Sequence, residues 1–183
     1  MVGNYLLEKR IGSWSFSLVW RARHIHHYGN KFAIKEIATE KLCQKLRDCL
    51  MWEIDILRQI KHPNIIALYD IVNRPRRIFL VLEYCSGGDL ASYIKRNGRL
   101  SQGVVRHFMI QLTSGLNVLR ENNLIHRDLK PQNLLLSRND SNAVLKIADF
   151  GFAQSIQPQG LGFKTELHLY GNPDSSLNLA QQE

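Results

Sequence analysis

Residues 126–133 read His126-Arg127-Asp128-Leu129-Lys130-Pro131-Gln132-Asn133, and they gather charged, imidazole and amide side chains into one predicted loop. Sixteen residues after Asn133, the tripeptide Asp149-Phe150-Gly151 follows a predicted strand over Val144–Ala148. Taken singly, an aspartate before a turn is commonly a cap rather than a catalytic group. The motifs that lie upstream decide between these two interpretations.

Three more signals precede these two in the chain. A segment over Gly12–Val19 joins two predicted strands, Ala33-Ile34-Lys35 lies on a third predicted strand, and Glu53 lies in the helix that follows. Each has an ordinary structural explanation, because Lys35 alternates with apolar neighbours as on the solvent side of a strand and Glu53 could be a solvated helix residue. The five signals in their fixed order are far more specific than any one of them.

The first 84 residues are predicted to form strands and one helix. Apolar and β-branched runs bounded by turn residues predict strands at 5–11, 18–26, 32–37, 65–72 and 78–84, with a turn at Tyr28-Gly29-Asn30. Apolar residues at spacings of four and three predict one amphipathic helix, with the stripe Leu42, Leu46, Leu50, Ile54 and Leu57. This helix must end near His62, because the residue before Pro63 avoids the helical conformation.

Helices are predicted to dominate the next part of the chain. Asp89 caps a short predicted helix that ends near Gly98, and Ser101 caps a longer one that ends at Asn122-Asn123. The apolar stripe of the longer helix is Val105, Phe108, Leu112, Leu116 and Leu119. Short strands are expected at 134–136 and 144–148, followed by a mostly irregular segment over 152–183. This order indicates an α+β chain in two lobes, with the boundary near residues 83–88.

The composition is that of a globular protein without a membrane span. The chain has 183 residues, of which 44% are hydrophobic and 22% charged. Its longest purely apolar run, Ile78–Leu82, is far shorter than the ~20 residues that a spanning helix needs, and the N-terminus has no secretory signal. The cysteines Cys43, Cys49 and Cys85 form no C-x-x-C pair, which indicates reduced thiols in a cytosolic or nuclear setting.

The net charge of +8 raises the question of a nucleic-acid partner. The basic residues are spread along the chain, and the densest group, Arg74, Arg76 and Arg77, has no interleaved aromatic residues. A nucleic-acid surface typically clusters its cations and adds stacking aromatics. We therefore expect no nucleic-acid binding and interpret this group as a solvated basic loop.

The five ordered motifs resemble those of the eukaryotic protein kinases. Lys130 after Asp128 is the form found in Ser/Thr kinases, and the longer stretches Asn123–Leu136 and Leu145–Ala153 are similar to the autophagy-initiating Ser/Thr kinases of plants. The resemblance implies a two-lobe α+β fold with a small lobe of antiparallel strands plus one helix (5–84). The first part of a helical, incomplete large lobe would follow (85–160), and then a divergent tail (161–183).

The resemblance also implies ATP-dependent phosphoryl transfer to protein hydroxyls, with Mg²⁺ as the metal. Asp128 would accept the proton of the substrate hydroxyl, and Lys130 would lie against the γ-phosphate. Lys35, oriented by Glu53, would hold the α- and β-phosphates, and Asn133 would share the metal with Asp149. The residues implied to contact the nucleotide are Ile11, Gly12, Val19, Ala33, Lys35, Glu83, Cys85, Asp89, Leu135 and Asp149.

Within that set, the backbone at Glu83 and Cys85 would bind adenine, and Asp89 would meet the ribose. The implied partners are ATP and protein substrates or proteins of the autophagy machinery. The implied location is the cytoplasm, with recruitment by partners to autophagosome precursor membranes.

Two departures from the family pattern modify these expectations. Trp14 and Ser17 stand where the phosphate loop has glycines that allow close approach to phosphate, and no A-P-E motif follows Gly151. We therefore expect a truncated form with negligible turnover on proteins, in which Arg127 lacks its phosphorylated partner. The alternative is a catalytically inactive kinase-like fragment that acts as a nucleotide- or partner-binding module.

The same departure leads to an expectation about stability. In the family, the stripe of the longer helix, from Val105 to Leu119, packs against a helix of the part that is absent here. Exposure of its five side chains would forfeit ~7–15 kcal/mol, as much as the ~5–15 kcal/mol that stabilises a typical domain. The large lobe is thus expected to be unstable alone.

Overall fold

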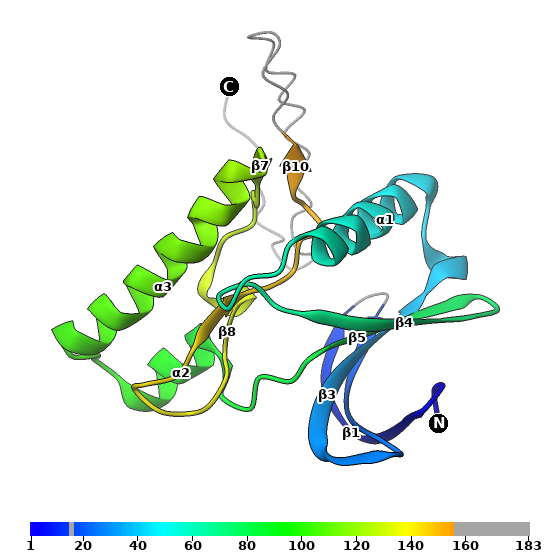
Figure 1. The fold of residues 1–183 in the computed structure, drawn as a ribbon, viewed down its shortest axis with the longest axis horizontal. Coiled ribbons are helices and arrows are strands. Elements are labelled where there is room, and N and C mark those ends of the chain that lie inside the picture. The colour runs from blue at the N-terminus through cyan, green and yellow to red at the C-terminus, as the bar shows by residue number, and fades with distance from the viewer. Residues whose placement is uncertain (15–16, 156–183) are drawn as a thin grey trace, which may run out of the picture.

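The computed structural model describes residues 1–14 and 17–155. The small lobe is an antiparallel sheet in the order β1-β2-β3-β5-β4, with helix α1 against one face (Figure 1). Its elements are β1 (Tyr5–Trp14), β2 (Ser17–His24), β3 (His27–Ala38), the 3-10 turn Thr39–Lys41, α1 (Gln44–Gln59), β4 (Leu68–Arg74) and β5 (Arg77–Glu83). The predicted small-lobe architecture is confirmed.

The β2–β3 hairpin differs from the prediction. The turn lies at residues 25–26 rather than at Tyr28-Gly29-Asn30, and His24 pairs directly with His27. The next partners are Arg23 and Lys31, so residues 28–30 form an insertion in β3. Extra residues on one strand of an antiparallel pair are accommodated as a bulge. The turn-forming residues of this segment therefore mark an irregularity within the strand.

Helix α1 presents its apolar stripe to the sheet and includes a carboxylate on the same face. Leu50, Ile54 and Leu57 are buried, and Glu53 is 5% exposed among them. The helix ends at Gln59, four residues before Pro63, as expected from the restriction on the residue before proline. The helical spacing thus turns Glu53 inward, toward β3.

The large lobe begins after the hinge at residues 84–87. Its helices are α2 (Leu90–Asn97) and α3 (Gln102–Glu121), capped by Asp89 and Ser101 as predicted. A small sheet in the order β6-β8-β9 lies beside them. The remaining elements are β6 (Gly88–Asp89), β7 (Leu124–Ile125), the 3-10 turn Pro131–Asn133, β8 (Leu134–Leu136), β9 (Leu145–Ile147) and β10 (Gln154–Ser155).

Strand β10 corrects the prediction of an irregular segment from residue 152. Gln154 pairs with Ile125 and Ser155 with Leu124 of β7, so the chain after Gly151 first forms a short antiparallel pair. A two-residue strand leaves no periodic signal in a sequence. Residues 156–183, including the predicted tail 161–183, lie outside the described residues. The domain boundaries stay predictions.

The stripe of α3 is covered more fully than expected. Phe108 and Leu119 are 3% and 2% exposed, and only Val105, at 44%, lies open among the five stripe residues. The β8–β9 hairpin covers this face, because Gly115 allows close approach: a Cβ there would lie 2.8 Å from Cδ1 of Ile147. The expectation that all five side chains are exposed is therefore wrong.

One hydrophobic core joins the two lobes. It extends from Leu57 of α1 through Ile65 to Phe108 and Phe150 of the large lobe. The segment between α1 and β4 is hydrogen-bonded to β9 of the large lobe, since the N–H of Ile66 donates to the carbonyl of Ile147 (3.0 Å). The hinge also packs closely on the large lobe at Gly87, because a Cβ there would lie 2.2 Å from the Arg138 carbonyl oxygen. Besides the hinge, the shared core and the α1–β4 segment thus hold the two lobes together.

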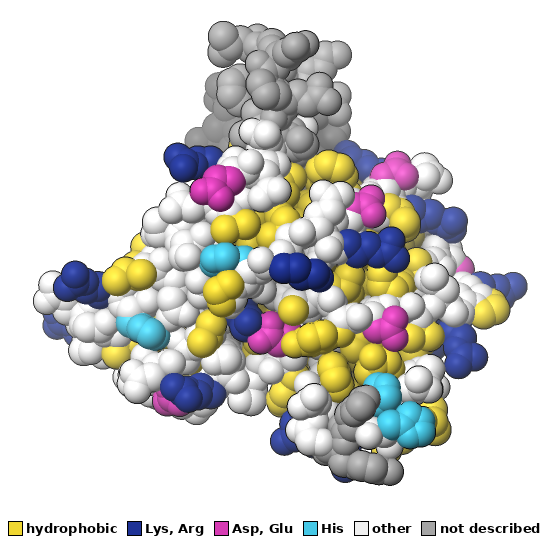
Figure 2. Space-filling view, in the orientation of Figure 1, with side chains coloured by type: hydrophobic (Ala, Val, Ile, Leu, Met, Phe, Trp, Pro, Cys, Tyr) yellow, Lys and Arg dark blue, Asp and Glu magenta, His cyan; other side chains and the backbone are white. Residues whose placement is uncertain are grey.

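Two surface features bear on the predictions from composition. Among the described residues, no helix is long and apolar enough to cross a membrane. Figure 2 shows the Lys and Arg side chains of the visible face scattered over many elements. This scatter agrees with the distribution of basic residues along the sequence.

Candidate active site

The predicted ion pair between strand β3 and helix α1 is present. The Nζ of Lys35 donates to both carboxylate oxygens of Glu53, at 2.9 and 3.1 Å, and lies 3.7 Å from Oδ1 of Asp149. Burial lowers the pKa of Lys35, but the carboxylates of Glu53 and Asp149 more than offset this, so its pKa is raised above the ordinary value. Three residues from distant parts of the chain therefore form one charged cluster.

The catalytic-loop residues form a second cluster around Asp128. Its carboxylate lies 2.8 Å from the Nζ of Lys130, and its Oδ2 accepts a hydrogen bond from Nδ2 of Asn133 at 2.9 Å. The same amide nitrogen donates to the Asp128 backbone carbonyl at 2.8 Å. Asn133 is 8% exposed. Asp128 is thus held in one orientation, with a cation beside it.

His126 connects the two clusters, a role that was not predicted from the sequence. Its Nδ1 accepts a hydrogen bond from the N–H of Asp128 (3.3 Å), and its Nε2 donates to the carbonyl of Ala148 (3.0 Å). Its ring centroid lies 5.1 Å from that of Phe150. The buried imidazole therefore fixes the catalytic loop against the residues that precede Asp149. The sequence signal that could have predicted this role is the position of His126 at the start of the 126–133 stretch.

Two residues of the site have left-handed backbone conformations, which are unfavourable for side chains other than glycine. They are Arg127 (φ 64°) and Asp149 (φ 65°). The guanidinium of Arg127 donates to the carbonyl of Phe152 and to Oε1 of Gln154, both at 2.6 Å. Arg127 therefore has two neutral acceptors, and its expected lack of a phosphorylated partner stays a prediction.

The chemistry of Asn133 and Asp149 fits a magnesium ion. Both hydrogen atoms of the Asn133 amide are directed to Asp128, which leaves its Oδ1 as an acceptor. The Asp149 side chain is 43% exposed, so one carboxylate is accessible. Mg²⁺ prefers oxygen ligands and commonly takes one or two carboxylates together with substrate phosphates. No group of three or more His, Cys, Asp or Glu suited to a metal occurs within residues 1–14 and 17–155.

Several of the residues predicted to surround the nucleotide lie on the sheet face that carries Lys35, and others lie on β6 and β8 of the large lobe. Val19 is the cross-strand partner of Lys35, and Gly12 is the partner of Val19. Ala33 lies two residues before Lys35 on β3, and Ile11 is 45% exposed on β1. On the large-lobe side, Leu135 of β8 pairs with Asp89. Their roles toward a nucleotide stay predictions.

Asp89 has a defined structural role. Its two carboxylate oxygens accept hydrogen bonds from the backbone N–H and the hydroxyl of Ser92, both at 2.8 Å. Burial raises the pKa of Asp89, but these hydrogen bonds and others from the backbone lower it below the ordinary value. The structure therefore shows the helix cap, and the contact with ribose stays a prediction.

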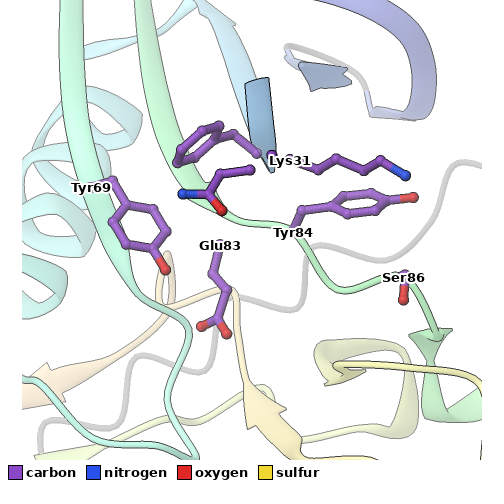
Figure 3. A pocket seen from close by; sticks show the side chains of 8 residues that line it. Lys31, Tyr69, Glu83, Tyr84 and Ser86 are labelled. Carbon is purple, nitrogen blue, oxygen red and sulfur yellow. The ribbon is translucent and has the colours of Figure 1, made fainter. Parts of the chain in front are cut away.

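A hollow of about 590 Å³ lies beside the hinge, and it was not predicted from the sequence. Glu83 is the only predicted nucleotide residue that lines it, together with Gly29, Asn30, Lys31, Phe32, Tyr69, Tyr84 and Ser86. Figure 3 shows Lys31 and Tyr84 extending in one direction, away from Tyr69 and the Glu83 carboxylate. That carboxylate is paired with Lys146 of β9 at 2.7 Å. No short sequence motif links these residues.

Cys85 in the hinge is expected to be an unreactive thiol. Burial raises its pKa to about 12, with a further contribution from the Glu83 carboxylate. Because the thiolate is the reactive form, we expect iodoacetamide at pH 8 to label Cys85 at least ~10²-fold more slowly than exposed Cys43. Peptide mass spectrometry would measure both rates. In urea the two rates should converge, and equal rates in the folded protein would contradict the burial of this thiol.

Comparison with known proteins agrees with this geometry. Residues 5–169 match the protein kinase domain family, so the chain belongs to the protein kinases. It is 59% identical over 161 residues to serine/threonine-protein kinase ATG1c of Arabidopsis thaliana, which covers 88% of this chain and 22% of that protein.

Two further relatives come from other organisms. Identity is 43% over 166 residues with serine/threonine-protein kinase atg1 of Dictyostelium discoideum, covering 87% of this chain and 25% of that protein. It is 40% over 164 residues with the human serine/threonine-protein kinase ULK1, covering 85% and 16%. The chain thus spans about a quarter or less of the length of these relatives.

Proposed function

We propose that this protein is an autophagy-type serine/threonine kinase, which transfers the γ-phosphoryl group of ATP to a hydroxyl of a protein substrate. The observation that carries the proposal is the presence of two charged clusters in one site. Lys35 and the buried Glu53 form an ion pair beside Asp149, and Asp128 is oriented by Lys130 and Asn133. Phosphoryl transfer requires this combination of phosphate neutralisation and positioning more than covalent chemistry by the protein.

Each charged group has a distinct role in the proposed reaction. Lys35, kept cationic by its two carboxylate neighbours, binds the α- and β-phosphates. Asp128 accepts the proton of the attacking hydroxyl, and Lys130 neutralises charge on the γ-phosphate. Asn133 and Asp149 would hold Mg²⁺, which supplies charge neutralisation at the phosphate oxygens. ATP and Mg²⁺ are therefore the proposed cofactors.

The second candidate is a module that binds nucleotide or a partner without turnover. Trp14 is the observation that favours it, because an indole replaces a phosphate-loop glycine. Partners from the autophagy machinery and a cytoplasmic location with recruitment to autophagosome precursor membranes are further proposals. Their support is the similarity to the ATG1 kinases.

Calorimetric titration of the purified chain with ATP tests the nucleotide site. We expect weak Mg²⁺-dependent binding, which Asp149→Asn weakens at least ~10-fold because one metal carboxylate is lost. Trp14→Gly should tighten ATP binding, because a glycine at this position of the phosphate loop allows the backbone to approach the phosphates closely. The exposed aspartate of the Arg138–Asp140 pair offers a matched control, Asp140→Asn, which should bind like the unmodified chain. Absence of ATP binding in folded Trp14→Gly protein would refute the proposal.

A further inference from the structure

Four cationic side chains lie on one face of three neighbouring strands of the small lobe. They are Lys9 of β1, Arg21 and Arg23 of β2, and Lys31 of β3, named here the basic strip. Lys9 is the cross-strand partner of Arg21, and Arg23 is the partner of Lys31. Directly paired residues share a face of a sheet, as do residues two apart on a strand. The strip therefore continues the face that carries Lys35, toward the end of the sheet nearest the hinge.

The charges of the basic strip are poorly compensated. Like charges directly opposite each other destabilise an antiparallel pair, and this face has two such pairs. Glu8 alone bonds to both Arg21, at 2.9 Å, and Arg23. Among the described residues, Lys9 and Lys31 form no ion pair, so four cations against one carboxylate leave a net charge of +3. The nearby Glu83 is already paired with Lys146.

We propose that the basic strip is a docking surface for an acidic, extended segment of a partner protein. The spacings fit such a segment: neighbouring strands lie ~4.8 Å apart and alternate residues ~7 Å apart, so the four charges cover about 10 by 7 Å. Carboxylates at alternate positions of an extended peptide repeat at the same ~7 Å. β1 is an edge strand of the sheet, so its outer side also has backbone groups available to an added strand.

The surroundings of the strip favour a peptide over other polyanions. The strip lies on the face of the sheet that carries Lys35, and three of its members, Lys9, Arg23 and Lys31, are exposed there and accessible to an extended peptide. The neighbouring residues on that face, Val19 and Ala33, are aliphatic, so aromatic side chains that could stack on bases lie only at the Lys31 end of the strip. Lys31 also borders the hollow lined by Phe32, Tyr69 and Tyr84, which would accept an apolar side chain of the segment.

A fluorescence anisotropy titration tests this surface independently of catalysis. The probe is a fluorescein-labelled decapeptide of alternating glutamate and serine, measured with the full chain in 50 mM salt. Arg23→Glu with Lys31→Glu should weaken binding at least ~10-fold. The control, Lys45→Glu with Arg106→Glu, makes the same change in net charge on α1 and α3 and should stay within ~2-fold. Glu8→Gln should tighten binding ~2- to 5-fold, because it frees two arginines.

A stability measurement separates docking from a structural role. Lys31→Glu replaces a like-charge pair with an opposite-charge pair beside Arg23, so the melting temperature should rise by about 1–3 °C while peptide binding falls. A lower melting temperature would show that Lys31 is a structural residue and would overturn the proposal.

Three binding results would also overturn it. The first is equal binding by the unmodified chain and the Arg23→Glu, Lys31→Glu variant, and the second is an equal loss in the control variant. The third is tighter binding, through the same residues, of a labelled oligo-dT or of phosphatidylserine vesicles. In that last case the strip would serve nucleic acid or membrane rather than an acidic protein segment.

Discussion

Replacing Lys35 with methionine is expected to lower the free energy of unfolding by about 3–5 kcal/mol and to abolish ATP binding. The reason is the Glu53 carboxylate, whose side chain is 6% exposed and would lose its cation. A buried charge left without its partner is far more costly than the loss of an exposed ion pair. Urea denaturation measures the first effect and calorimetric titration the second.

The double variant Lys35→Met with Glu53→Gln separates the two effects. Removal of the orphaned charge should restore most of the lost stability, while ATP binding stays absent because the cation that neutralises the phosphates is gone. Because the pKa of Lys35 is raised above 10.5, the stabilisation that its charge contributes is lost as the pH rises from 10.5 through the higher folded-state value. A Lys35→Met variant as stable as the unmodified chain would contradict the role of this pair.

Asp128→Asn is expected to reduce phosphoryl transfer, itself expected to be very slow on proteins because no A-P-E motif follows Gly151, by about 10²–10⁴-fold while it leaves the affinity for ATP within ~2-fold. The asparagine has nearly the same size and shape as the aspartate, but it cannot accept the proton of the attacking hydroxyl. The affinity is kept because the proposed role of Asp128 is toward the attacking hydroxyl rather than toward ATP, and the asparagine oxygen can still accept the hydrogen bond from Asn133. Transfer of labelled phosphate from ATP to a pool of serine and threonine peptides measures the effect.

The outcome of this comparison distinguishes the two candidate functions. A kinase requires that the unmodified chain transfers phosphate at a rate well above that of Asp128→Asn. If both bind ATP and neither transfers phosphate, the binding module is the correct function. The exposed carboxylate of Asp140 offers a control, since Asp140→Asn should leave the rate unchanged.

Much of the fold could be predicted because its signals are local. The helix caps Asp89 and Ser101 and the stripe of α1 are set by residues three or four positions apart, and the sequence predicted them, except that Leu42 of the predicted stripe precedes α1. The α3 stripe shows that local signals do not predict which parts of the chain cover a helix face. Periodicity identified the apolar face, but burial of Phe108 and Leu119 depends on the β8–β9 hairpin, which meets that face only in the folded chain.

The sequence by itself determined the family and the residues of the two charged clusters, because short motifs in a fixed order carry that information. The tertiary structure decided which of these residues meet. Lys35 and Glu53 are 18 positions apart and bond only because α1 packs on β3, and His126 joins the catalytic loop to Ala148 across 22 positions. The basic strip depends likewise on strand register, which places Arg23 opposite Lys31. Such contacts arise from pairing and burial between distant segments, and no local pattern encodes them.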